Sequence, residues 1–466
     1  MTKILISRRS FNLEDQKKFA DFSGDTNPIH LSEKYARKTP PGKPIVHGIN
    51  TFLWALDGYC ETEDNLYEKI NIKFLQPIYL NEEIFCYFYP NEKKIEVSNN
   101  NIVFLTATFN GAEYANKRID YNKTPEKIEI NEYDIYDIDA MFHSNEPLDF
   151  SYTANSKLIK PLYPNLYKKI ADSIVCEVSC LSAIVGMQLP GLHSIFVSLK
   201  IDLSNLDQRA INTLEIIKAD NRFNIVDIKA SSENITSIIR AIVRPKPIEG
   251  LSSNELKGLL EFEKDFNKKI LVIGGSRGLG SVVVKILSLL GCSVTFTYSK
   301  GKEEALSLKE ELSKSGKDVG FIKFDINEPN MGELFLSNPE YIFYFPTPKI
   351  FVKRSKIFEE GLYKNFYFYY VDSFTKIFNK SLEHSVNSIF YPSSIAIEED
   401  SNDMPEYVKA KSEGEVLCEK LKENNKVNIL MKRLPRTLTD QTSTNLDIKS
   451  ETPFDVMLPI IKEFLS

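Results

Sequence analysis

The sequence predicts an α+β N-terminal region followed by an α/β region with a doubly wound parallel sheet. Two patterns indicate this. Up to about residue 247, a helical stretch followed by strand-like runs occurs twice, and from about residue 269 strands and helices alternate. Such alternation is typical of a parallel sheet with helices on both faces. The 466 residues are enough for about three domains of ~150 residues each.

The first predicted domain spans residues 1–127. A loop rich in proline and glycine, TPPGKP, leads to an apolar helical stretch after Gly48, INTFLWALDGY. Strand-like runs rich in β-branched and aromatic residues follow, namely YEKINIKF, EIFCYFY, KIEVS and NIVFLTATF. This order predicts one helix wrapped by an antiparallel sheet.

The second predicted domain, residues 128–247, repeats that layout. A helical stretch, VCEVSCLSAIVGMQL, precedes the strand-like runs SIFVSLKIDL, TLEIIKA, FNIVDIKAS and ITSIIRAIV. The repeat favours two copies of one module, although the residues themselves hardly match. We expect residues 248–268, which include the charged stretch SSNELKGLLEFEKDFNKK, to form a linker helix.

The third predicted domain spans residues 269–466. Its first strand is KKILVIGG, its first helix SVVVKILSLLG ends at Gly291, and a second strand and helix follow as SVTFTY and KEEALSLKEELSKSG. Further strand-like runs are VGFIKF, YIFYF, SIFYP and VNILMKR. This alternation predicts the doubly wound parallel sheet.

The charge balance and hydropathy exclude several function classes. The 64 acidic and 58 basic residues give a net charge of −6, which argues against nucleic acid as the main partner. Hydrophobic residues make up 42% of the chain, so a large core is available. No apolar run reaches ~18 residues, so we expect no membrane span.

The cysteines and the N-terminus indicate a cytoplasmic protein. The six cysteines are scattered and form no CxxC pair, which favours reduced thiols over a disulfide framework or a zinc site. We therefore expect no metal centre. The start MTKILISRRSF has basic residues but no apolar core before a cleavage site, so we expect mature protein without a signal peptide.

The first candidate site lies in the stretch GDTNPIH, residues 24–30, where Asp25 and His30 stand five residues apart. Pro28 keeps Asn27 out of the α region, and Asn and Asp favour turns, so a bent loop can aim both side chains at one point. A carboxylate and an imidazole held together can deprotonate a water and protonate a nearby carbon. The alternative is a turn in which Asp25 only caps the next helix.

This stretch, followed by Ala36 and later by IVHG at residues 45–48, resembles the signature of the MaoC-like enoyl-thioester hydratases, the hydratase 2 family. The resemblance covers roughly residues 8–115. It implies a hot-dog fold, in which a sheet wraps a central helix, with Asp25 and His30 as the water-activating pair. It also implies that the Gly48 backbone N–H polarises the thioester carbonyl, which suits the positive potential of a helix N-terminus. Asn27 is expected to brace the loop.

The second domain looks like a hot dog without that signature. The resemblance implies a double hot dog with one active half, so we expect residues 128–247 to be a scaffold that lines the substrate tunnel. His193 follows PGL at residues 190–192, and we expect it to be buried or in a loop rather than catalytic.

The second candidate site begins with GGSRGLG, residues 274–280, which follows a strand and opens a helix. Glycines let the backbone approach a pyrophosphate, and the helix N-terminus favours its charge. The glycine spacing resembles the short-chain dehydrogenase/reductase family, a Rossmann-type fold. The cofactor-binding residues that this implies are Gly274, Ser276, Arg277, Gly278, Leu279 and Gly280.

Ser394 follows a predicted strand, and Tyr407 and Lys411 are spaced to share one helix face. A lone YxxxK arises often by chance, but here it follows the Gly-rich turn and the serine in the family's order. A cation one turn from a phenol is expected to lower the phenol's pKa. By resemblance, Tyr407 is the proton donor, Lys411 orients the ribose and lowers that pKa, and Ser394 holds the substrate oxygen.

Three further positions bear on the cofactor. By resemblance, Asp325 contacts the adenine, and Pro435 with the following TLTDQT closes over the nicotinamide. The second strand ends at Lys300 without an acid, and Arg277 lies in the Gly-rich turn. Because a 2′-phosphate is stabilised by such cations, we predict NADP(H) over NAD(H).

The third domain also departs from the family. FPTP at residues 345–348 stands where the family has Asn-Asn-Ala-Gly, and Asn365 is only the nearest match to the catalytic asparagine. The sequence ends at Ser466 without the family's usual last strand, so the family's mode of oligomerisation cannot be carried over. A homodimer remains one assembly open to this chain.

The two resemblances together predict a bifunctional enzyme acting on acyl-CoA or acyl-carrier-protein thioesters. One unit would interconvert a trans-2-enoyl and an (R)-3-hydroxyacyl thioester, and the other would reduce a 3-oxoacyl thioester with NADPH. Two alternatives stay open at this point. The reductase could act on another carbonyl, of a polyketide or nucleotide-sugar pathway, or the domain could bind NADP without catalysis.

Overall fold

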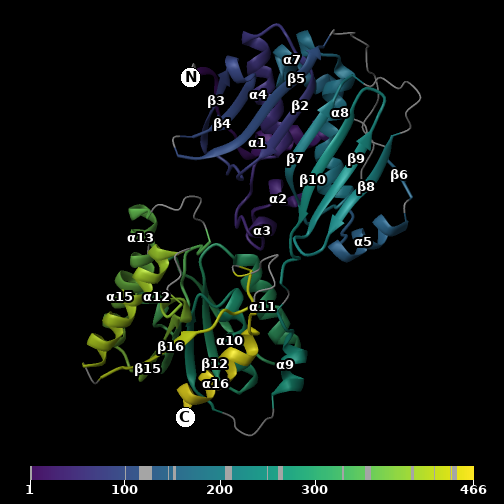
Figure 1. Ribbon diagram of the computed structural model, residues 1–466. Helices are drawn as coiled ribbons and strands as arrows, with labels where there is room; N and C mark the ends of the chain where they lie inside the picture. Colours follow the sequence, from purple (N-terminus) through teal and green to yellow (C-terminus); the bar gives the residue numbers. More distant parts are fainter. Residues whose placement is uncertain are drawn as a thin grey trace. The chain divides into compact units, whose positions relative to one another are not determined.

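The computed structural model describes most of the chain. The described residues are 3–99, 101–114, 129–144, 146–150, 154–204, 212–248, 250–260, 266–327, 330–351, 358–399, 404–423, 426–440, 442 and 449–466. Among them, contacts define two compact units, one up to Lys246 and one from Pro247 onward (Figure 1).

The first unit is built on one ten-stranded antiparallel sheet. Its strand order is β1-β3-β4-β5-β2-β7-β10-β9-β8-β6, and β2 and β7 pair at the junction of the two halves. In β3 buried and less buried residues alternate, as expected of a sheet with one face on a core. The strands are β1 (Ile4–Ser10), β2 (Tyr67–Phe74), β3 (Glu83–Tyr89), β4 (Lys94–Ser98), β5 (Val103–Glu113), β6 (Leu148–Asp149), β7 (Ser194–Asp202), β8 (Thr213–Asp220), β9 (Ile225–Ser231) and β10 (Thr236–Val243).

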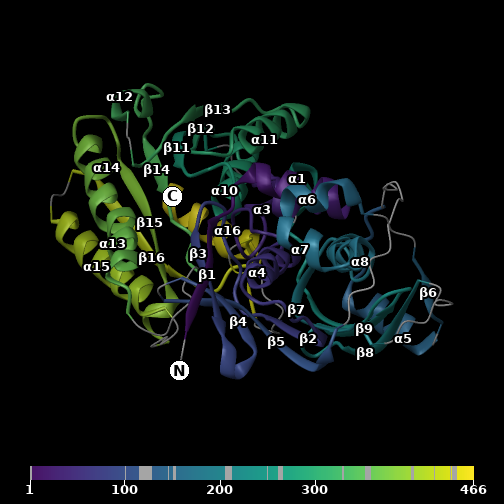
Figure 2. The same ribbon diagram turned by 90° about the horizontal axis from the view of Figure 1, so that it is seen from above.

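Two long helices, α4 and α8, lie against the same face of this sheet, one from each half (Figures 1 and 2). Both are buried on nearly all sides, because they lie in one core that runs through both halves. The helical segments are α1 (Leu13–Ser23), α2 (Pro28–Leu31), α3 (Glu33–Ala36), α4 (Gly48–Thr62), η1 (Pro90–Glu92), α5 (Ile135–Ser144), η2 (Ser156–Leu158), α6 (Ile159–Leu162), α7 (Pro164–Lys169), α8 (Asp172–Ala183) and the π-helical turn η3 (Ile184–Gln188).

The second unit contains a six-stranded parallel sheet with the order β13-β12-β11-β14-β15-β16. Counted within the unit, this is the order 3-2-1-4-5-6 of a Rossmann-type doubly wound sheet. The predicted parallel sheet is therefore confirmed. The strands are β11 (Lys269–Ile273), β12 (Ser293–Tyr298), β13 (Gly320–Lys323), β14 (Tyr341–Tyr344), β15 (Ser388–Ser394) and β16 (Asn428–Leu434).

Successive residues of β11 enter two different cores. Ile270 and Val272 pack with α10 and α16, whereas Leu271 and Ile273 face the core that contains residues of η4, α14 and α15 (Figure 2). A strand buried on both faces reads as a continuous apolar run. The helical segments are α9 (Ser253–Leu259), α10 (Gly278–Leu289), α11 (Lys302–Lys314), α12 (Met331–Leu334), α13 (Glu360–Tyr367), the π-helical turn η4 (Phe368–Asp372), α14 (Ser373–Ser381), η5 (Ile395–Ile397), α15 (Pro405–Lys422) and α16 (Pro453–Leu465).

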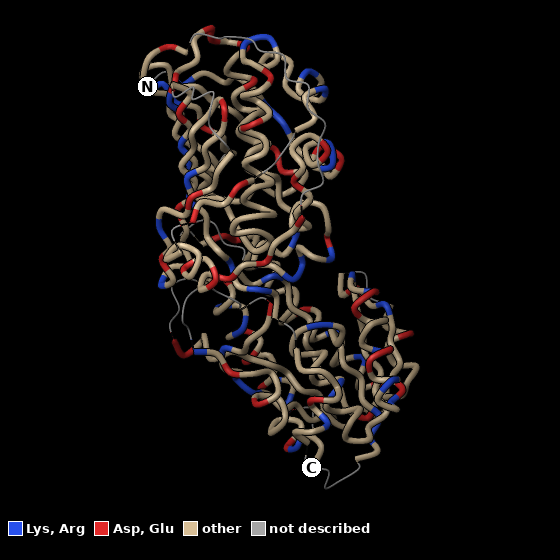
Figure 3. Tube along the Cα trace, turned by 90° about the vertical axis from the view of Figure 1, so that its right-hand side faces the viewer, with Lys and Arg blue, Asp and Glu red and all other residues tan. Residues whose placement is uncertain are grey.

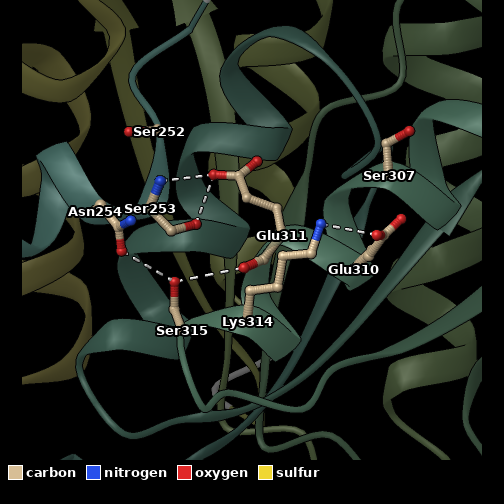
Figure 4. A pocket seen from close by; sticks show the side chains of 8 residues that line it. All are labelled: Ser252, Ser253, Asn254, Ser307, Glu310, Glu311, Lys314 and Ser315. Atoms are coloured by element: carbon tan, nitrogen blue, oxygen red, sulfur yellow. Dashed lines mark hydrogen bonds and ion pairs between the residues drawn. The ribbon is translucent and has the colours of Figure 1, made fainter.

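The stretch expected to be a linker helix belongs in part to the second core. Helix α9 covers only Ser253–Leu259, and Leu256 is fully buried against residues of α10. Glu311 of α11 accepts hydrogen bonds from the Ser253 N–H and Oγ at 2.6 and 2.7 Å, beside a polar pocket of about 340 Å³ (Figure 4). This segment is therefore packed onto the second unit rather than suspended between units.

Charges of both signs are interspersed along the described chain (Figure 3). None of the described helices combines the length and the apolar character that crossing a bilayer requires. All six cysteines lie in the described part of the chain, where they are buried and form no disulfide.

Candidate active sites

The loop of residues 24–30 makes two sharp turns. Gly24 ends α1 in the left-handed region, with φ of 76°, and its N–H donates to the Ala20 carbonyl at 2.8 Å. Asn27 is extended before Pro28, as the proline requires, and its Oδ1 caps α2 by accepting from the Ile29 N–H at 3.1 Å. The residue that caps the helix is therefore Asn27, which leaves the Asp25 carboxylate for other partners.

Asp25, His30 and His47 converge. One oxygen or nitrogen of each side chain lies within 4.8 Å of the other two. The two imidazole rings stack with centroids 3.8 Å apart, and His47 Nε2 lies 3.8 Å from Asp25 Oδ2. The predicted pair of Asp25 and His30 is thus brought together. His47, which the sequence placed only at a helix start, is the third member.

Both imidazoles have hydrogen-bond partners. Gln16 Oε1 accepts from the His47 backbone N–H at 3.0 Å and lies 2.9 Å from His47 Nδ1, and the Asp25 carbonyl oxygen lies 3.3 Å from His47 Nε2, so each ring nitrogen of His47 faces an acceptor and one of them must donate. His30 Nδ1 lies 2.9 Å from the Ile45 carbonyl and must also donate. Burial lowers the pKa of both rings, which keeps them neutral, and in His30 the lone pair is then on Nε2.

The Asp25 carboxylate is buried and only partly compensated. Burial raises the pKa of Asp25, while the proximity of His30 and hydrogen bonds from Ser182 Oγ and the Asn27 N–H lower it in part. The cluster therefore offers two acceptors, the Asp25 carboxylate and His30 Nε2, which together suit a water molecule. Such atoms can also bind divalent cations.

Helix α4 begins at Gly48, directly after His47. The first N–H groups of a helix have no partner inside it and carry its positive end, so they lie beside the cluster. A Cβ on Gly48 would lie 2.9 Å from Phe74 Cε1, which explains why glycine stands here. The geometry agrees with the predicted place of Gly48, a backbone donor next to Asp25 and His30.

The second half of the unit holds the loop along its length. Ser182 Oγ donates to Asp25 Oδ2 at 2.6 Å, and Asn27 Nδ2 donates to the carbonyls of Gly186 and Leu192 at 2.7 and 3.2 Å. The Thr26 N–H lies 3.1 Å from the sulfur of Met187. Asn27 therefore braces the loop as expected, but the sequence did not indicate that Ser182 would contact Asp25.

His193 is buried beside this segment, in agreement with the expected buried or loop role. Its Nε2 lies 3.6 Å from Glu132 Oε2, and burial lowers its pKa. No described contact joins it to Asp25 or His30.

An apolar void of about 20 Å³ lies between the two long helices. Its lining includes Val178, one helical turn from Ser182, and Phe52, one turn from Gly48. The void is therefore close to the cluster, and its lining comes from both halves. The lining residues are Phe52, Leu53, Leu56, Leu66, Ile70, Leu166, Ile170, Ile174, Val175, Val178, Ile201 and Leu203.

In the second unit, the predicted Gly-rich turn joins β11 to α10. Gly274 and Gly278 have φ of 80° and 55°, and a Cβ on Gly280 would lie 2.2 Å from the Gly274 carbonyl oxygen. A Cβ on Gly278 would meet nothing within 4 Å, so the outer side of the turn is open. Arg277 Nη1 is buried and has no hydrogen-bond partner among the described residues. An anionic cofactor fits this turn.

The other residues of the turn have separate surroundings. Leu279 is partly buried against the core, and a Cβ on Gly301 would lie 3.5 Å from Ser276 Oγ. Ser276 is therefore near the segment that follows Lys300.

Lys300 and Asp325 lie where β12 and β13 end. Asp325 accepts hydrogen bonds from Ser299 Oγ at 3.4 Å and from the Asn327 N–H at 3.0 Å, and these groups, with Lys300, keep the pKa of Asp325 low. The second strand, β12, itself ends without an acid, as expected. The neighbouring strand supplies one, because parallel strands end at the same edge.

Ser394, Tyr407 and Lys411 come together as predicted. Ser394 ends β15, Tyr407 and Lys411 lie on α15, and a hydrogen bond with Ser394 lowers the Tyr407 pKa. Burial nevertheless raises the pKa of Tyr407 overall, so the expected lowering is wrong. Lys411 Nζ donates to the Pro392 carbonyl at 2.7 Å and lies 6.0 Å from the Tyr407 ring centroid, and burial lowers its own pKa to about 7.

Tyr370 is a site residue that the sequence did not reveal. Its ring centroid lies 3.9 Å from Lys411 Nζ, and its hydroxyl lies 2.6 Å from Thr347 Oγ1. The π-helical turn η4 presents this ring, whereas Asn365 lies earlier, in α13. Thr347 belongs to the FPTP segment in which the sequence departs from the resembled family.

Pro435 follows β16, and its carbonyl accepts a hydrogen bond from Thr437 Oγ1 at 2.9 Å. Of the segment after it, Gln441 and residues 443–448 lie outside the described residues. Its predicted closure over the nicotinamide stays a prediction.

Comparison with known proteins identifies the kind of domain that contains the first site. The family model described as MaoC like domain matches residues 4–107. Residues 4–107 form a MaoC like domain. A 3-hydroxybutyryl-CoA dehydratase from Methylorubrum extorquens is 45% identical over 51 residues, which are 11% of this chain. The chain spans 31% of the length of that relative.

Solved structures resemble part of the chain at low identity. A short-chain dehydrogenase/reductase from Serratia marcescens is 16% identical with a TM-score of 0.38, covering 43% of this chain and 91% of that one. A short chain dehydrogenase from Escherichia coli complexed with NADPH is 12% identical with a TM-score of 0.39, covering 43% and 92%. FolM alternative dihydrofolate reductase 1 from Brucella suis in complex with NADP is 13% identical with a TM-score of 0.35, covering 37% and 74%. TM-scores in this range do not identify an activity.

Proposed function

We propose that the protein is a bifunctional enzyme of acyl-thioester metabolism. Its first unit, a double hot dog with one active half, would hydrate trans-2-enoyl thioesters to (R)-3-hydroxyacyl thioesters or catalyse the reverse dehydration. Its second unit would be an NADP-dependent 3-oxoacyl-thioester reductase. The observation that carries the proposal is the convergence of Asp25, His30 and His47 at the start of α4 inside a MaoC like domain.

The first site can perform the hydration with its own residues. A water between Asp25 and His30 finds only acceptors, so both of its hydrogens can be bound and its oxygen can point at the substrate. As this oxygen adds to Cβ, the pair takes one proton, and the electron pair of the double bond moves to the thioester oxygen beside the Gly48 N–H. The same pair then returns the proton to Cα, so that H and OH are added from one side.

The void between α4 and α8 supports a short acyl chain. Its volume of about 20 Å³ has room for about one methyl group before side chains must move. The relative with the name 3-hydroxybutyryl-CoA dehydratase is named for a four-carbon acyl group, which is in keeping with this size. We therefore propose crotonyl and similar short thioesters as substrates.

The second site has groups suited to NADPH and to a carbonyl substrate. The Gly-rich turn would hold the pyrophosphate, and Arg277 and Lys300 would stabilise the 2′-phosphate even with Asp325 close to Lys300. The bound nicotinamide would supply the hydride. Ser394 would hold the carbonyl oxygen, and Tyr407, kept protonated by burial, would donate a proton to it.

The two reactions follow one another, because the 3-hydroxyacyl thioester is the product of the reduction and the substrate of the dehydration. Linking two activities in one chain raises the local concentration of the shared intermediate. With NADPH as reductant, we propose reduction followed by dehydration as the direction.

The test uses the full chain in two assays. Crotonyl-CoA should lose its enoyl absorbance, and acetoacetyl-CoA should oxidise NADPH. Asp25→Asn should stop only the first reaction and Tyr407→Phe only the second. A protein inert in both assays with both CoA and carrier-protein thioesters contradicts the proposal.

One observation favours a second candidate for the reductase unit, that of an NADP-binding domain without catalysis. Tyr407 is only 8% exposed, and the FPTP segment is tied to Tyr370. Tight NADPH binding with no reduction of acetoacetyl-CoA or other carbonyls, and no effect of Tyr407→Phe on any rate, would support that candidate.

A further inference from the structure

We infer that the half of the first unit without the catalytic signature positions the catalytic aspartate, with Ser182 as the positioning residue and the π-helical turn η3 as its support. The inference rests on the proposed hydratase function. It assigns to residues 172–192 a part in the reaction beyond that of a scaffold or tunnel wall.

The first observation is how the Asp25 carboxylate is held. Ser182 Oγ donates to Oδ2 at 2.6 Å, and the Asn27 N–H donates to Oδ1 at 3.1 Å. With one donor on each oxygen, the plane of the carboxylate is determined. Ser182 is buried, 4% exposed, so no bulk water competes for its hydrogen. A short hydrogen bond to a buried carboxylate is among the stronger ones in proteins.

The second observation is how η3 provides an acceptor for the loop. The Leu189 N–H donates to Ile184 O at 2.8 Å and the Gly191 N–H to Val185 O at 3.0 Å. In a regular α-helix Gly186 O would accept from residue 190, which is a proline without an N–H. This carbonyl is therefore available for Asn27 Nδ2, at 2.7 Å.

The third observation is the lack of a side chain at Gly186. A Cβ there would lie 3.1 and 3.2 Å from the two Asp25 carboxylate oxygens, closer than most Cβ contacts. Glycine thus lets the turn approach the carboxylate. Ser182, Gly186 and the segment up to Leu192 together leave Asp25 one orientation, toward His30 and His47.

The charged and titratable groups around Asp25 set the expected pH effect. His30 on α2 and His47 before α4 face it from the first half, and Ser182 faces it from α8. The hydrogen bond from Ser182 lowers the Asp25 pKa. Its removal raises that pKa, so hydration, which needs the ionised carboxylate, is lost at a higher pH than in the wild type.

The experiment compares Ser182→Ala with Ser179→Ala and Ser182→Thr. Ser179 is a matched control, because it is buried on the same helix and its Oγ donates to the Cys176 carbonyl at 2.7 Å. For crotonyl-CoA hydration by Ser182→Ala we expect kcat to fall about tenfold or more, KM to change little, and the acid limb to move to higher pH. Ser182→Thr, which keeps the hydroxyl, should restore the profile. A Ser182→Ala profile equal to that of Ser179→Ala overturns the inference.

A second measurement does not depend on activity. Amide hydrogen exchange of residues 24–31, followed by mass spectrometry without substrate, should be faster in Ser182→Ala and unchanged in Ser179→Ala. A wild type that hydrates no thioester contradicts the proposed function, and the inference is then decided by exchange alone. Exchange equal to wild type in Ser182→Ala overturns the positioning role.

Discussion

The two candidate sites are assembled in different ways. In the first unit a loop of seven residues carries both Asp25 and His30, and a segment 157 positions away from Asp25 in sequence holds it in place. In the second unit the groups come from the ends of parallel strands and from one helix, because all strands of such a sheet end at the same edge. The short motif in the sequence therefore indicates Asp25 and His30, but not the residues that hold them. The groups of the second site are far apart in sequence, and the topology of the sheet brings them together.

The sites also differ in how burial shifts the pKa values of their groups. In the first, burial raises the pKa of Asp25, which makes its carboxylate a stronger base, and lowers the pKa of His30, which keeps the imidazole neutral. In the second, burial raises the pKa of Tyr407 and lowers that of Lys411 to about 7. In the proposed function, the first site accepts a proton from water and the second donates one to a carbonyl.

The strongest test of this comparison removes the carboxylate of the first site. Asp25→Asn should lower kcat for crotonyl-CoA hydration by about 10³-fold, since general acid–base catalysis supplies 10²–10⁴. NADPH oxidation with acetoacetyl-CoA, measured on the same preparation, should be unchanged. Loss of both activities would show that the two sites are not independent.

The mirror experiment removes the proton donor of the second site. Tyr407→Phe should lower the rate of acetoacetyl-CoA reduction by about 10²-fold or more, because the ring stays and only the hydroxyl is lost. Enoyl absorbance assays should show wild-type hydration. A reduction rate equal to that of the wild type would mean that Tyr407 is not the donor.

The next largest effect is expected on the choice between NADPH and NADH. Arg277→Asp should weaken NADPH binding by about tenfold, since the cation beside a 2′-phosphate is replaced by an anion. NADH binding should change less, because NADH lacks that phosphate. Titration of cofactor fluorescence gives both dissociation constants, and an unchanged NADPH constant would contradict the assignment to NADP.

The smallest effect is expected at Tyr370. Its ring stabilises the Lys411 ammonium, so Tyr370→Leu should lower the Lys411 pKa further, and Tyr370→Phe should not. Lys411 is charged below about pH 7 and neutral above it, so reduction that needs the cation should decline as pH rises through about 7. In Tyr370→Leu this decline should begin at lower pH, with a threefold or smaller rise in KM for NADPH, about 0.6 kcal/mol. Identical pH profiles in Tyr370→Leu and wild type would exclude the ring as a partner of Lys411.

Sequence patterns that extend over a few residues were enough to predict these helices and strands. The apolar stretch after Gly48, the alternating runs of the first unit and the strand–turn–helix around Gly274 all appear in the structure where the sequence placed them. They depend on local periodicity and on turn residues, which act over a few positions. The prediction of a linker was less successful, since Leu256 packs in a hydrophobic core that local sequence cannot reveal.

The sequence by itself determined the order of elements, the parallel sheet and the short motif with Asp25 and His30, because these follow from residue types at fixed spacing. Only the tertiary structure decided that Ser182 reaches Asp25, that Asp325 stands beside Ser299 and that Tyr370 faces Lys411. It also reversed the expected shift of Tyr407. The physical reason is that burial and contacts between distant segments depend on the packed chain, and desolvation, which dominates these groups, is absent from any local pattern.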